Sequence, residues 1–76
     1  MEIAPHISVD SNVHHGAAVI TGTRMPVSII VGSLAGGMSK EDVSREYAVT
    51  IEQIDAALSF AADLVSKIQA VSLAGD

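Results

Sequence analysis

Two consecutive helix-start signals of the same design constrain this fold more than any other feature of the chain. In the first, Ser39 is a natural N-cap, and Asp42 stands three residues later, where its carboxylate can reach back to the cap. In the second, Thr50 and Gln53 repeat the arrangement. Only residues 48–50 separate the expected end of one helix from the start of the next, so the spacing predicts a helix-turn-helix.

The sequence before these signals predicts a short β-hairpin and one more helix. Residues 1–6 look like a loosely held start, and two β-prone runs joined by a turn-rich loop predict a hairpin with its loop over residues 7–24. Residues 26–73 then predict three helices. Pro26 fits the first turn of the first of them, and Gly36 follows its end. The expected helices cover residues 26–35, 40–47 and 51–71. We therefore expect a single, mainly α domain over residues 1–76.

The third helix carries an apolar face too wide for the first two helices to cover. A chain of this length buries only about 60% of its unfolded surface, which favours self-association. The far half of the helix presents Leu64, Val65, Ile68 and Val71. This periodicity predicts that these four residues form a partner contact, most simply within a homodimer.

The charges of the chain argue against strong binding to nucleic acid. Nine acidic residues against four basic ones give a formal net charge of −5, which repels phosphate on average. The residues that could serve a nucleic-acid interface are Lys40, Arg45, Thr50 and Gln53. Among them only Gln53 suits a base edge on the recognition helix, while Glu52 and Asp55 would repel phosphates. We expect DNA binding by the isolated protein to be weak.

Arg24 is the most informative single residue outside the helices. It lies between a Gly-Thr turn and Pro26, so its guanidinium either pins backbone carbonyls at this junction or contacts a partner. The pinning role is favoured because five donors suit the tying of a loop. Thr23 beside it is expected to help cap the first helix.

Catalytic, metal and cofactor sites are not predicted. His14 and His15 are neighbours that would point to opposite sides of an extended chain, so with His6 and Asp10 they lack the spacing of a zinc site. The chain has no cysteine, no secretion signal and no run of ~20 apolar residues that could span a membrane. We expect a cytoplasmic protein that is not an enzyme and needs no cofactor.

Several segments together resemble a known family. They are residues 7–10, Gly16, residues 19–27, residues 37–39, Tyr47 and residues 54–58. Over about residues 7–64 the chain resembles family 433 of the domains of unknown function, although Ala17 and Ala18 replace a common Lys and Pro. The resemblance implies a winged-helix or homeodomain-like trihelical fold behind a β-hairpin. It also implies a likeness to bacterial and archaeal antitoxins of type II toxin–antitoxin systems, which often accompany a PIN-like ribonuclease toxin.

These observations predict a non-enzymatic, antitoxin-like regulator that binds a protein partner and binds operator DNA weakly. The alternative is a helix-turn-helix transcription factor that binds DNA directly. The two differ in salt dependence, because phosphate contacts weaken steeply as salt rises whereas an apolar protein contact does not.

Overall fold

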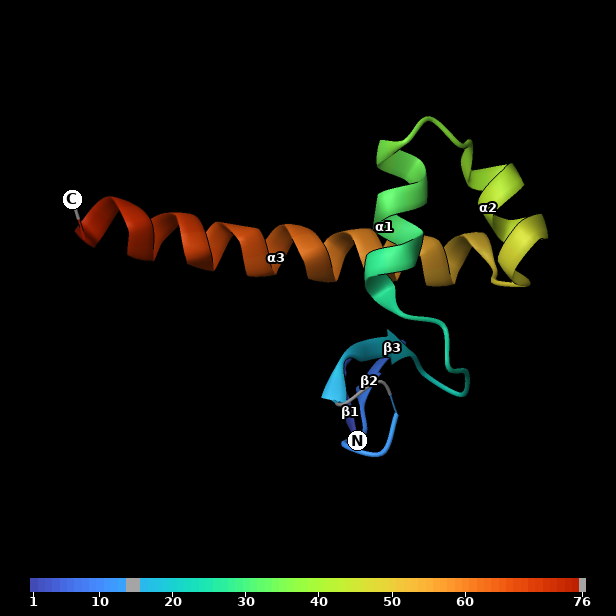
Figure 1. The fold of residues 1–76 in the computed structure, drawn as a ribbon, viewed down its shortest axis with the longest axis horizontal. Helices are drawn as coiled ribbons and strands as arrows, with labels where there is room; N and C mark the ends of the chain where they lie inside the picture. The colour runs from blue at the N-terminus through green and yellow to red at the C-terminus, as the bar shows by residue number, and fades with distance from the viewer. Residues whose placement is uncertain (14–15, 76) are drawn as a thin grey trace.

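The protein folds into a small sheet followed by three helices. The computed structural model describes residues 1–13 and 16–75, and it places the side chains of residues 1–13 and 16–68. His14, His15 and the side chain of Val71 lie outside these described residues. Figure 1 shows the sheet beneath the helices, with α1 crossing α3, α2 packed at the start of α3, and the far half of α3 extending beyond the rest of the molecule. The expected order of β structure and then three helices is confirmed.

The sheet has three antiparallel strands rather than the two of the predicted hairpin. The strands are β1 (Glu2–Ala4), β2 (Ile7–Val9) and β3 (Ala18–Ile20), in the order β1-β2-β3. The predicted pair is present, with Ile7 opposite Ile20 and Val9 opposite Ala18. Alternation along β2 buries Ile7 completely and leaves Ser8 half-buried beside Thr21, with which it shares a 2.6 Å hydrogen bond.

The expectation of a loosely held start at residues 1–6 is wrong, because β1 is tied to β2 at both ends. The N-terminal ammonium of Met1 donates to the Val9 carbonyl at 2.8 Å, and the Val9 N–H donates to the Met1 carbonyl at 2.9 Å. At the other end His6 adopts a left-handed conformation (φ 66°), and its N–H donates to a Glu2 carboxylate oxygen at 3.1 Å. A tight turn at Pro5 and His6 therefore lets the first residues of the chain pair with β2 as a third strand.

Helix α1 (Val27–Ala35) begins one residue later than predicted. Pro26 is its N-cap, in an extended conformation, because it forms an isolated antiparallel bridge with Val19. The expected capping by Thr23 is also wrong: its hydroxyl donates to the Ile20 carbonyl at 2.7 Å and accepts from the Met25 N–H at 3.0 Å. The Thr23 side chain stabilises the turn before the helix instead of the helix end.

The helix-start signals are present at α2 (Lys40–Tyr47) and α3 (Ile51–Gly75). Ser39 caps α2 by accepting from the Asp42 N–H at 3.0 Å, but the Asp42 carboxylate pairs with Arg45. At α3 the capping box is reciprocal, since the Thr50 N–H donates to Gln53 at 2.8 Å and the Gln53 N–H donates to the Thr50 hydroxyl at 3.0 Å. Helix α3 also continues past the predicted end at residue 71.

The connection from α2 to α3 requires a left-handed residue. Ala48 has φ 55° and ψ 46°, which for a residue with a Cβ costs about 1–2 kcal/mol. Beyond it Val49 is buried, and the Ser44 hydroxyl donates to the Val49 carbonyl at 2.5 Å. The small Ser44 side chain thus ties the end of α2 to the turn.

The core lies where the sheet, α1 and α2 meet the first half of α3. Its buried members are Ile7, Val19, Ile20, Val27, Ile30, Val43, Val49, Ile54 and Ala57. Among the side chains that the structure places, none of the buried ones is polar or charged. Tyr47 at the edge of this core shares a 2.9 Å hydrogen bond with Ser33, which joins α2 to α1. Because the core ends near Ala57, the far half of α3 is left without covering elements in the described chain.

Candidate protein-binding groove

An apolar groove of about 430 Å³ opens between α1, α3 and the segment that leads into β3. Its lining residues are Ala17, Ala18, Val27, Ser28, Val31, Gly32, Phe60, Ala61 and Leu64. None of these residues is charged, and Ser28 supplies the only side-chain hydroxyl. A groove of this composition favours an apolar occupant because a charged group inside it would lose its hydration without a partner.

Small side chains create the groove. Gly32 lies inside α1, where glycine is less favourable than alanine by about 1 kcal/mol. A Cβ built at Gly32 would meet no atom within 4 Å, so the space above this residue is open. Ala61 of α3 and the neighbouring Ala17 and Ala18 also line this space with small side chains. A glycine inside a predicted helix is the one sequence signal that could have pointed to this site.

The groove continues along α3 onto exposed apolar side chains. Leu64 lines the groove and is 48% exposed, and Val65 and Ile68 beyond it are 59% and 61% exposed. Three of the four residues predicted for a partner contact are therefore exposed to solvent in this structure, and the partner contact itself stays a prediction. Leu64 joins them to a concave surface that sequence reasoning did not detect.

Arg24, the fifth residue predicted to contact a partner, lies apart from the groove lining. It is exposed on the connection between β3 and α1, and it is already engaged in an interaction within the chain. The junction itself is held by the Ile20 N–H, which donates to the Met25 carbonyl at 2.9 Å. The groove and Arg24 are therefore separate candidate contacts.

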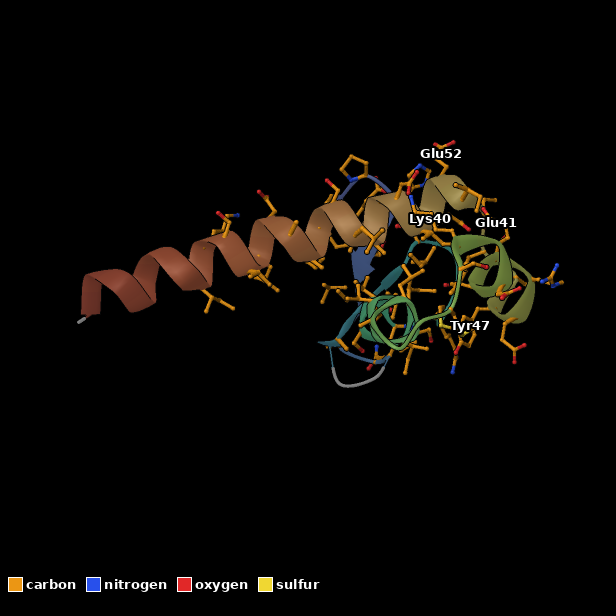
Figure 2. The ribbon with its side chains drawn as sticks, turned by 90° about the horizontal axis from the view of Figure 1, so that it is seen from above. Lys40, Glu41, Tyr47 and Glu52 are labelled. Atoms are coloured by element: carbon orange, nitrogen blue, oxygen red, sulfur yellow. The ribbon has the colours of Figure 1, made fainter. Side chains whose placement is uncertain are left out.

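The residues predicted for nucleic-acid binding are engaged in contacts within the chain. Lys40 reaches α3 and pairs with Asp55 at 2.5 Å (Figure 2), while Arg45 pairs with Asp42 on its own helix. Thr50 and Gln53 cap each other, as described above. Lys40 starts α2, whereas Thr50 and Gln53 lie at the start of α3, and the charged groups of Lys40 and Arg45 already contact acidic side chains of this chain.

His6 contacts α3 rather than a metal-ligand cluster. Its Nε2 lies 2.9 Å from a carboxylate oxygen of Glu52, which joins the β1–β2 turn to the first turn of α3. Within residues 1–13 and 16–75 the structure shows no group of three or more histidine, cysteine, aspartate or glutamate residues placed to hold a metal ion. Nor does any helix in the described part of the chain combine the length and hydropathy needed to cross a bilayer.

The chain is thus a small domain of one three-stranded antiparallel sheet and three helices, with an uncharged groove beside α3. The chain belongs to the family described as "Protein of unknown function (DUF433)", which matches residues 7–61. The match covers β2, β3, α1, α2 and the start of α3 as far as Ala61, and strand β1 lies outside it. The resemblance noted from the sequence is therefore confirmed at the level of the family.

A solved structure has a similar fold. The X-ray crystal structure of Rv2018 from Mycobacterium tuberculosis matches with a TM-score of 0.63 and 29% sequence identity over 68% of this chain. The match spans only 24% of the Rv2018 chain, so the present domain corresponds to about a quarter of that protein. No curated protein matches the chain.

Proposed function

We propose that this chain is a non-enzymatic, antitoxin-like regulator that acts in the cytoplasm by binding a protein partner. The observation that carries the proposal is the groove of about 430 Å³ together with the exposed apolar side chains of α3 beside it. Contiguous apolar surface of this kind on a small domain is typical of a protein-binding site. In this proposal the protein is a homodimer, and its foreign partner is a PIN-like ribonuclease toxin.

The negative net charge of the chain supports the proposal that its partner is a basic protein. The net charge is −5, and the exposed acids include Glu41, Glu46, Glu52 and Asp63. A ribonuclease carries positive charge where it binds RNA phosphates, so an acidic protein of this kind would be drawn to that face. Occupation of the face would exclude RNA. Arg24 remains a second candidate contact in this proposal.

Co-expression with the product of the neighbouring gene tests the proposal. We expect the two proteins to copurify and the toxicity of the neighbour to be relieved. The variant Arg24→Ala weakens the complex if Arg24 faces the partner, and mainly lowers the melting temperature if it only ties its loop. A matched control is Thr23→Ala, which removes the adjacent hydroxyl that bonds within the turn. A neighbour that is neither toxic nor retained in the complex would refute the antitoxin role.

A helix-turn-helix transcription factor is the second candidate, and the α2–α3 pair favours it. The two helices are joined by only three residues, Ala48, Val49 and Thr50, and both begin with capping side chains. Against it stands the engagement of Lys40 and Arg45 by acidic neighbours. Titration of duplex DNA from the upstream region at several salt concentrations separates the candidates. Tight binding that weakens steeply with salt would favour the transcription factor, and weak binding the antitoxin-like regulator.

A further inference from the structure

The chain exposes more surface than a monomer of its mass should. Its accessible area is 5029 Å² at a mass of 7.8 kDa. Monomeric globular proteins of this mass expose about 4,400 Å² by the usual scaling of area with mass, an excess here of roughly 600 Å². A standard protein interface buries about 800 Å² per partner. The excess is therefore about three quarters of the area that one subunit contributes to a standard dimer interface.

The far half of α3 and the groove are complementary in chemistry. The groove is uncharged, and small residues on both helices, Gly32 and Ala61 among them, leave room in it for an apolar side chain of another helix. Ile68 lies one helical turn beyond Leu64 and on the same face of α3, so the exposed apolar stripe runs directly out of the groove. One chain thus carries both the groove and an apolar helix face that matches it in chemistry.

We propose that the groove is filled by the far half of α3 from a second copy of this chain. The inference rests on the proposed function, since it names the occupant of the surface assigned there to protein binding. Two α3 helices that pair antiparallel and cross near Leu64 bring Ile68 of each copy over Ala61 and Gly32 of the other. The contact is isologous, so one twofold arrangement covers both grooves and both apolar stripes at once. A copy of the same chain satisfies the geometry without any charged group being buried.

Sedimentation of three matched variants tests this dimer. Wild type should sediment as a dimer, whereas Gly32→Glu and Ile68→Glu should sediment as monomers because each places a carboxylate in the apolar contact. A Cβ at Gly32 meets no atom within 4 Å and α1 favours a residue with a Cβ, so the helical circular dichroism should be retained. The control is Ser66→Glu, which adds the same charge to an exposed residue on the opposite side of α3 from Ile68 and should remain dimeric. A monomeric wild type, or a dimer that both glutamate variants leave intact, would overturn the proposal.

Disulfide trapping tests the pairing itself. The chain has no cysteine, so a cysteine introduced at one position reports only on that position. Mixing Gly32→Cys chains with Ile68→Cys chains should yield a cross-linked heterodimer on oxidation. The mixture of Gly32→Cys with Ser66→Cys should yield far less. Equal cross-linking in both mixtures would show that α3 of one copy does not seat in the groove of the other.

The same variants separate this inference from the antitoxin proposal. A wild type that is monomeric yet binds and neutralises the neighbouring gene's product would refute the dimer and leave the antitoxin role standing. If the wild type is a dimer with the expected cross-link but the neighbouring gene does not encode a toxin, the dimer is supported and the antitoxin role is refuted. Each proposal therefore has its own decisive result.

Discussion

Replacing Ala48 by glycine should stabilise the protein, although the same change almost anywhere else in its helices should destabilise it. Ala48 ends α2 in the left-handed region (φ 55°, ψ 46°) and its side chain is exposed, so its methyl group has little packing to lose. The left-handed conformation costs a residue with a Cβ about 1–2 kcal/mol. Glycine avoids most of this cost but loses about 0.5–1 kcal/mol more conformational entropy on folding.

The difference is a net gain of about 0.5–1 kcal/mol in the free energy of unfolding for Ala48→Gly. For a domain of this size that raises the melting temperature by roughly 2–8 °C. The matched control is Ala62→Gly, at an exposed position in the interior of α3, where the same change should cost about 1 kcal/mol.

Urea unfolding followed by far-ultraviolet circular dichroism measures both variants, at one protein concentration because association would shift the midpoint. The midpoint should rise for Ala48→Gly and fall for Ala62→Gly, with equal slopes. If Ala48→Gly lowered the midpoint as much as the control, the argument from the left-handed turn would be refuted. The connection from α2 to α3 would then have to reach its geometry without strain at residue 48.

Three further predictions concern the core, the caps and the ion pair. Ile54→Ala should lower the free energy of unfolding by about 2–5 kcal/mol, because Ile54 is fully buried, and urea titration should show a lower midpoint. Gln53→Ala should cost about 0.5–2 kcal/mol and should add little to Thr50→Ala, since each side chain caps the other; strictly additive losses in a double-mutant cycle would contradict the reciprocal box. The partly exposed pair of Lys40 and Asp55 should show a coupling of only about 0.2–1 kcal/mol that shrinks in high salt, and a larger salt-independent coupling would contradict its placement near the surface.

The elements that could be predicted from the sequence are those that depend on interactions between residues close together in the chain. The caps at Ser39 and Thr50 act within three residues, so their signal needs no knowledge of the rest of the chain. The order of sheet and helices and the exposure of Val65 and Ile68 follow in the same way from short-range periodicity. Where a local rule had two outcomes, another local contact chose between them: Asp42 pairs with Arg45 three residues later on the same helix instead of returning to the cap.

Only the tertiary structure decided which distant segments meet. Strand β1 forms because the backbone of Met1 hydrogen-bonds to Val9. The first residues of the chain carry no sequence pattern that predicts a strand. The groove exists because residues of α1 and α3, among them Gly32 and Ala61, line one space, and no pattern along either helix encodes that packing. The sequence by itself thus determined the helices, the caps at Ser39 and Thr50 and the exposed apolar stripe, because these depend on neighbours three or four residues away. Packing determined the third strand and the groove, because both depend on which surfaces face each other after folding.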